Sequence, residues 1–215
     1  MIESAQVPSS PLFFLSYARD GNGTDNVPAH EVRLQVIRFF EDLSENVARL
    51  TARRPGADPG FMDRTIRAGT RWSDELLSAL GTCQVFIALI CGAYTTSEWC
   101  AMEWDGFSQR QVADATGNPG PLVPVIWAPY PRNRIPHIIT DLEWFSPGSA
   151  PNANILGDYE EFGLSGLLWT KQEDSYRVIV WRLARHIADF CHNYYIEEQT
   201  PRKEDLRDIF QESLS

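Results

Sequence analysis

The chain has 215 residues, and 43% of them are hydrophobic, which suffices for one large domain or for one domain with a small appendage. Its formal net charge of −10 would repel a nucleic-acid backbone, so nucleic-acid binding is disfavoured. No apolar run approaches the roughly 20 residues that a membrane-spanning helix needs, and the polar start MIESAQVPSS is unlike a signal peptide.

The first half of the chain predicts two strands around one long helix. Residues 1–10 are expected to be a flexible lead-in, and the apolar run Leu12–Tyr17 predicts a buried strand. Phe61–Asp63 predicts a short, weak second strand. Between them, apolar residues at spacings of four, three, four and three positions predict an amphipathic helix: Val36, Phe40, Leu43, Val47 and Leu50.

The middle of the chain alternates between helices and apolar strands. Ser73 is a good N-cap for a helix that begins DELLSAL, and Gln84–Ile90 predicts a strongly apolar third strand. Ser97 is a second N-cap, with Glu98 suited to the positive end of the helix dipole that follows. Leu122–Trp127 predicts a fourth strand.

The last third is less regular. Prolines forbid a long helix near Ile135–Phe145, which predicts a short turn or helix and a small edge strand. Asp158–Thr170 is expected to be a loop with at most one helical turn. A long amphipathic helix is predicted from Tyr176, Val180, Leu183, Ile187, Phe190 and Tyr194. Thr200 and Pro201 then predict the start of a short helix that carries Leu206, Ile209, Phe210 and Leu214.

This alternation predicts an α/β fold: a doubly wound, flavodoxin-like parallel sheet of order 2-1-3-4-5 with helices on both faces. Such sheets bind ligands beyond the carboxyl ends of their strands, where the strand order reverses. In this order the crevice lies between strands 1 and 3. The segments that follow those strands are Ser16–Asp20 and Cys91–Glu103.

One acidic residue stands out in the second of these segments. If the helix begins after Ser97, then Trp99, Glu103 and Phe107 share one face, which should point at the sheet. A carboxylate there must be paired, protonated or reserved for a ligand. It is therefore either a structural glutamate, bonded to backbone or to an arginine, or a functional group in the crevice.

Four segments in this order resemble the boxes of Toll/interleukin-1 receptor (TIR) domains. They are FFLSYARD, DRTIRAGTRWSDELLSAL, VFIALICGAYTTSEWCAMEW with its S-x-W-C-x-x-E signature, and LVPVIW. The resemblance covers about residues 11–195, and it implies a TIR domain over 11–197 with a helical tail or linker over 198–215. The segment Gly60–Arg64 is also similar to that of bacterial TIR-like proteins of the FxsC type, which occur with peptide-maturation gene clusters.

The resemblance implies an NAD+ glycohydrolase, which cleaves the bond between nicotinamide and ribose. It carries the catalytic glutamate onto Glu103 and the aromatic residue on the nicotinamide side onto Trp99. Four further positions match the substrate site: Arg19 as a basic residue near the ligand, Trp72 in a loop that closes over it, and Ser16 and Tyr17 on the floor. NAD+ would be the substrate, with no cofactor and no metal.

The chemistry is reasonable for these residue types. Departure of nicotinamide builds oxocarbenium character on the ribose, which a carboxylate stabilises, and an aromatic ring can stack on the cationic nicotinamide. The resemblance further implies activation by TIR–TIR self-association, and a bacterial immune or toxin-like effector with a possible sensor domain or partner at the C-terminus. The four cysteines show no zinc-ligand spacing, and reduced thiols favour a cytoplasmic location.

Three other readings remain. The first is a non-catalytic TIR adaptor that works by homotypic association, through the loop Arg64–Trp72 and the helix from Ser73. The second is a nucleoside-processing enzyme similar to 2-deoxyribosyltransferases, supported only by a sheet and an acid. The third, a response-regulator receiver, is disfavoured because Cys91 and Gly92 stand where that chemistry needs an aspartate.

Overall fold

The computed structural model describes residues 10–18, 29–52, 58–63, 73–110, 121–148 and 154–212. Four parallel strands form one sheet in the order β2-β1-β3-β4. Their bounds are β1 (Phe13–Ser16), β2 (Gly60–Met62), β3 (Val85–Ile90) and β4 (Leu122–Ile126). The predicted doubly wound α/β fold is confirmed, and the strand order reverses between β1 and β3 as expected.

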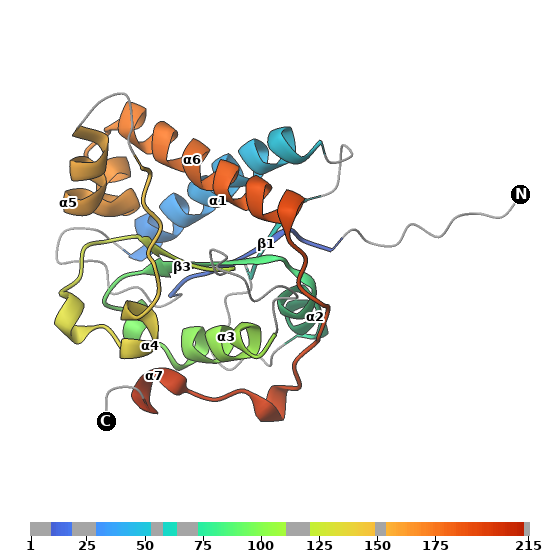
Figure 1. Ribbon diagram of the computed structural model, residues 1–215. Helices are drawn as coiled ribbons and strands as arrows, with labels where there is room; N and C mark the ends of the chain where they lie inside the picture. The colour runs from blue at the N-terminus through green and yellow to red at the C-terminus, as the bar shows by residue number, and fades with distance from the viewer. Residues whose placement is uncertain are drawn as a thin grey trace, which may run out of the picture.

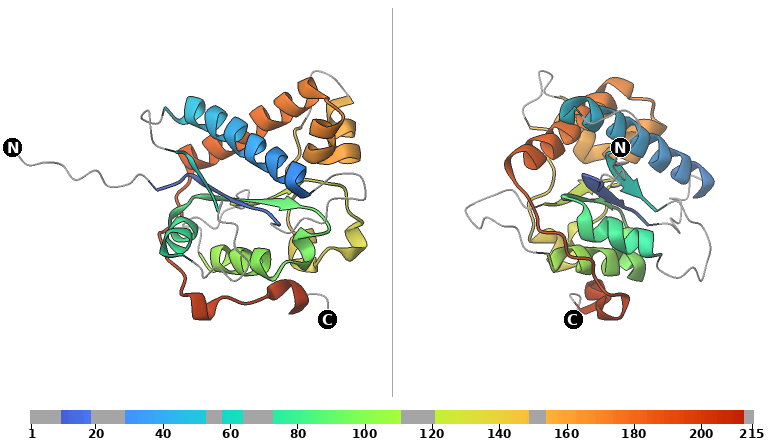
Figure 2. Two further views of the ribbon diagram at one scale, coloured as in Figure 1. Left: turned by 180° about the vertical axis from the view of Figure 1, so that it is seen from behind. Right: turned by 90° about the vertical axis from the view of Figure 1, so that its right-hand side faces the viewer.

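Helices cover both faces of the sheet (Figures 1 and 2). On one face lie α1 (Ala29–Thr51), α5 (Asn154–Trp169) and α6 (Glu173–Asn193). On the other face lie α2 (Asp74–Thr82), α3 (Glu98–Ser108) and the short α7 (Ile209–Glu212). The remaining short elements are α4 (His137–Thr140) and three 3₁₀ turns: η1 (Tyr94–Thr96), η2 (Arg132–Arg134) and η3 (Lys203–Asp205).

The centre of the sheet explains the apolar strands. Every residue of β3 is buried, because this strand has neighbours on both edges and helices on both faces. On β1, the ring of Phe14 stacks between Phe61 and Phe86, at 5.5 Å from each ring centroid. The predicted N-cap at Ser73 is confirmed, because its side chain accepts a hydrogen bond from the Leu76 amide at 3.1 Å.

The predicted fifth strand is wrong for the part of the chain that the structure describes. Residues 135–145 form α4 followed by extended chain, which donates one backbone hydrogen bond to β4, from the Phe145 amide to the Pro124 carbonyl at 2.9 Å. Pro124 has no amide to offer in return. Two positions on, the Ile126 amide donates to the Tyr159 hydroxyl at 2.8 Å. The outer edge of β4 is thus closed by a proline and a side chain.

The prediction of a loop over Asp158–Thr170 is also wrong, because α5 runs through this segment. Its helix pattern is hidden by three glycines and by a break at Gly163, where φ is 62° and ψ is 178°. At that break the helix lies against Trp127, the residue that directly follows β4. A Cβ on Gly163 would lie 2.6 Å from the Trp127 carbonyl oxygen. Tertiary contact rather than local propensity therefore fixes α5.

The C-terminal segment, residues 194–212, runs back across α2 and α3 (Figure 1). The helix predicted to start at Pro201 is wrong, since only η3 and α7 are helical there. Gln84 joins the segment to the start of β3, because its amide group both accepts from the Ile196 amide at 2.7 Å and donates to the Ile196 carbonyl at 3.3 Å. Arg207 bonds the buried Asp105 of α3 at 3.1 Å. Residues 198–212 therefore lie on the body of the protein.

Two further expectations concern the N-terminal residues and the lack of a membrane-spanning helix. The lead-in over residues 1–10 lies, except for Ser10, outside the described residues. None of the helices that the structure describes is both long and apolar enough to cross a membrane.

Candidate functional site

Glu103 is held between two hydrogen-bond donors at the carboxyl ends of β1 and β3. Its Oε1 accepts from the indole Nε1 of Trp99 at 2.7 Å, and its Oε2 accepts from Ser16 Oγ at 2.6 Å. The glutamate side chain is only 3% exposed. Each carboxylate oxygen accepts one of these two bonds, which together fix the orientation of the group.

Local sequence signals put this carboxylate in place. Ser97 caps α3, and its side chain accepts from the Cys100 amide at 3.3 Å. With the start of the helix fixed, Trp99 and Glu103 are one turn apart and face the same way. Phe107, a further turn on, is buried against Phe86 of β3 with ring centroids 5.3 Å apart. The predicted face of α3 therefore does point at the sheet.

A third polar residue, Tyr94 of η1, completes the cluster. Its hydroxyl lies 3.0 Å from Ser16 Oγ. An ionised Glu103 only accepts, so the Ser16 proton is used on Glu103 and the Tyr94 hydroxyl donates to Ser16. Burial, with the neighbouring Cys100 and the Glu103 charge, raises the pKa of Tyr94 well above its usual value. The phenol stays protonated at neutral pH, and a chain of donors runs from Tyr94 through Ser16 to Glu103.

Tyr94 was not predicted from the sequence. Its only local signal is a hydroxyl-bearing aromatic in the segment after β3, three residues before the Ser97 cap. That signal does not reveal a bond to Ser16, which lies far away in the sequence at the end of β1. The fourth group beside the carboxylate is the thiol of Cys100, whose pKa is raised well above its usual value by burial and then by the Glu103 charge. This thiol is therefore an uncharged neighbour.

The structure brings together only some of the residues predicted for the substrate site. Ser16, Trp99 and Glu103 are bonded to one another. The Tyr17 hydroxyl instead donates to the Asp63 carbonyl at the end of β2, at 2.9 Å. Arg19 and Trp72 lie outside the described residues.

Comparison with known families gives one result. The TIR domain family matches residues 38–153, more than half of the chain, a stretch that contains both Trp99 and Glu103. A search of curated proteins found no match. The matched stretch runs from α1 through β2, β3 and α3 to beyond β4, with the strand order expected for this fold. The chain belongs to the TIR domain family.

Proposed function

We propose that the protein is an NAD+ glycohydrolase in which Glu103 acts on the ribose of the substrate. TIR domains include NAD-cleaving enzymes and non-catalytic adaptors, so membership alone does not decide between them. The observation that supports catalysis is a glutamate with both oxygens oriented, placed where the strand order of the sheet reverses. Open α/β sheets bind their ligands at that position.

In the proposed reaction, the bond between nicotinamide and C1 of the ribose breaks, and its electron pair leaves with the nicotinamide, which becomes neutral. The ribose gains positive charge in the transition state. A carboxylate fixed beside it stabilises that charge most effectively in a site from which water is excluded. A water molecule then adds to C1 and loses a proton, giving ADP-ribose, or a hydroxyl of the same molecule adds and gives a cyclic form.

Trp99 and Ser16 would serve this reaction in two ways. Trp99 donates its ring nitrogen to Glu103, and its half-buried ring would stack on the cationic nicotinamide. Ser16 and Tyr94 hold the second carboxylate oxygen from the sheet side. A preoriented acid does not need to reorganise as charge develops, which is the usual origin of such catalysis.

The adaptor reading rests on the same contacts. A glutamate that is only 3% exposed and bonded to two protein donors can serve as a structural link between α3 and β1. In that case, substitution of Glu103 would change the unfolding free energy of the protein, and the wild type would have no NAD+ cleavage activity.

Nicotinamide release from NAD+, measured at high protein concentration and with the chain fused to an oligomerising partner, separates these readings. We expect release by the wild type and loss of at least about a hundredfold in Glu103→Gln, a typical effect for an electrostatic group. Glu98→Gln is the matched control, because Glu98 is exposed on the same helix. Circular dichroism must show that all three proteins are folded. Absence of release from the folded wild type would contradict the glycohydrolase proposal and favour the adaptor reading.

A further inference from the structure

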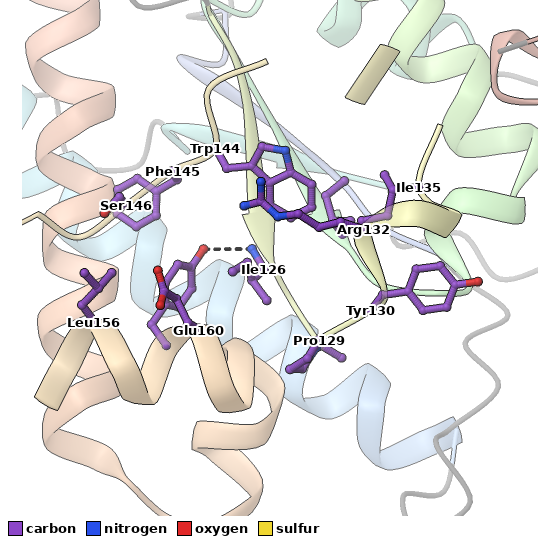
Figure 3. A pocket seen from close by; sticks show the side chains of 13 residues that line it. Ile126, Pro129, Tyr130, Arg132, Ile135, Trp144, Phe145, Ser146, Leu156 and Glu160 are labelled. Atoms are coloured by element: carbon purple, nitrogen blue, oxygen red, sulfur yellow. Dashed lines mark hydrogen bonds between the residues drawn. The ribbon is translucent and has the colours of Figure 1, made fainter. Parts of the chain in front are cut away.

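A cavity lies at the carboxyl end of the sheet, beside β4, and Glu103 is not among the residues that line it (Figure 3). It has a volume of about 310 Å³, at the lower end of the range for small-molecule sites. Its floor is formed by Ile90 and Ile126, the last residues of β3 and β4. None of the residues that hold Glu103 lines it. It is therefore separate from the crevice between β1 and β3, although it also lies at the carboxyl ends of strands.

Polar and apolar groups both line this cavity, and one of the polar groups is a buried hydroxyl. Leu156 and Phe145 form apolar walls, and Tyr159 is 1% exposed. The Tyr159 oxygen accepts the Ile126 amide, the bond drawn as a dashed line in Figure 3. Burial raises the pKa of this phenol, so it keeps its proton. In the described part of the chain that proton has no acceptor, which leaves a buried donor for an acceptor on a ligand.

Charges of opposite sign flank the mouth. Arg132 of η2 lies over the ring of Trp144, with its guanidinium carbon 5.2 Å from the ring centroid. Glu160 stands next to Tyr159 on α5, and both charged side chains are exposed. Among the described residues neither takes part in an ion pair, although the chain has many exposed pairs elsewhere. One cation and one anion at a single mouth fit a ligand that carries both charges.

We propose that this cavity binds a free aromatic amino acid of the tyrosine type. The ammonium group would meet Glu160, the carboxylate would meet Arg132, and the ring would lie along the apolar side chains of Leu156 and Phe145. The hydroxyl at the far end of the ring would accept the Tyr159 proton. A small aliphatic amino acid would leave much of the cavity empty, and the contacts along the Trp144 and Phe145 walls would be lost.

The binding of L-tyrosine to the full chain is measured by ligand-observed saturation-transfer NMR and titration calorimetry. Three comparison ligands each lack one group: tyramine has no carboxylate, 3-(4-hydroxyphenyl)propionate has no ammonium group, and L-phenylalanine has no hydroxyl. We expect each to bind about two- to tenfold more weakly than L-tyrosine, since exposed charges and single hydrogen bonds have effects of this size.

Variants assign each ligand group to its residue. Arg132→Gln should remove the advantage of L-tyrosine over tyramine, and Glu160→Gln should remove its advantage over the propionate. Arg134→Gln and Glu161→Gln are matched controls, because both residues are exposed neighbours that do not line the cavity. Glu103→Gln should bind L-tyrosine like the wild type, whether or not the protein cleaves NAD+.

The proposal fails if L-tyrosine does not bind the wild type up to its solubility limit, or if Glu103→Gln, shown to be folded by circular dichroism, does not bind it. It also fails if tyramine and the propionate bind as tightly as L-tyrosine, since the two charges would then have no role. Tyr159→Phe loses the acceptor for the Ile126 amide and can be destabilised. The comparison of L-tyrosine with L-phenylalanine on the wild type tests the hydroxyl contact without that variant.

Discussion

Phe210, near the end of the chain, lies against Tyr94 behind the candidate site, with ring centroids 5.8 Å apart and an interplanar angle of 45°. Tyr94 in turn bonds Ser16, which bonds Glu103. Phe210 also meets the ring of Trp104 on α3 edge-on, at 5.9 Å. The C-terminal segment thus packs on the side of Tyr94 and α3 that faces away from the sheet. Through Tyr94 and Ser16 it contributes to the position of Glu103.

Phe210→Ala should therefore affect both stability and the site. Truncation of a fully buried phenylalanine costs up to about 3–5 kcal/mol of unfolding free energy. Residues 194–212 form only short elements on the outside of α2 and α3, so part of this cost is expected as local release of this segment, seen as faster amide hydrogen exchange there. Urea denaturation measures the global effect. Leu34→Ala is the control, since Leu34 is 60% exposed; equal effects from both changes would contradict the supporting role.

Trp99→Phe keeps an aromatic ring but removes the donor to Glu103 Oε1. A buried carboxylate that loses one of its donors should cost about 1–3 kcal/mol of unfolding free energy. A double-mutant cycle with Glu103→Ala, which removes the acceptor, isolates the coupling between the two side chains. Trp169→Phe controls for the substitution itself, because Trp169 is 45% exposed on α5. A coupling near zero would show that the 2.7 Å bond does not orient the acid.

The parts of the site that the sequence predicts are those fixed by local signals. A serine cap sets the start of α3, and a spacing of four then brings Trp99 next to Glu103. Strand order adds Ser16, because β1 and β3 are neighbours in any sheet of this class. Tyr94 and Phe210 could not be found in this way. Their roles depend on contacts between segments far apart in the chain, which no periodicity records.

The two wrong predictions about the fold, the fifth strand and the loop over Asp158–Thr170, have a similar origin. The edge of β4 is closed by Tyr159 from α5, a contact that replaces the predicted fifth strand. In α5 itself, glycines lower the helix propensity, while burial of Tyr159, Leu164 and Leu167 outweighs it. At the edge of β4 and in α5, tertiary packing therefore outweighs the weak local preference of the sequence for strand or loop.

Two of the three glycines of α5, Gly157 and Gly163, should respond in opposite ways to alanine. Gly163 has φ of 62° with ψ of 178°, a conformation that is almost restricted to glycine, and a Cβ there would meet the Trp127 carbonyl oxygen at 2.6 Å. Gly163→Ala should cost about 1–3 kcal/mol of unfolding free energy or more. A Cβ on Gly157 would meet nothing within 4 Å, so Gly157→Ala should stabilise by about 0.4–1 kcal/mol. Thermal unfolding of the two variants checks the difference in sign.

The four free cysteines should react with alkylating agents in a fixed order. Cys83 and Cys100 are fully buried, and burial raises the pKa of Cys83 to about 12 and that of Cys100 well above its usual value. Cys91 is half-buried, and burial raises its pKa too. Because modification needs both access and the thiolate form, the half-buried Cys91 and Cys191 should be modified before Cys83 and Cys100 at pH 8 in the folded protein. Peptide mass spectrometry against time gives the order, and early labelling of Cys100 would contradict the packing of α3.

Mild acid should destabilise the protein through His186. Its ring meets Phe145 edge-on at 6.3 Å, and burial lowers its pKa below 6.5, although the charges of Asp189 and Glu143 act in the opposite direction. The unfolded chain therefore binds the proton more readily, so unfolding free energy falls as pH drops below about 6.5, by about 1.4 kcal/mol for each unit of pKa depression. Below the folded-state pKa this contribution becomes constant. Urea titrations between about pH 7.5 and 5.5 measure the unfolding free energy against pH. The wild type and the control His192→Gln, whose histidine is exposed, should show this slope, and His186→Gln should show a flatter profile. An unchanged slope in His186→Gln would assign the effect to another group.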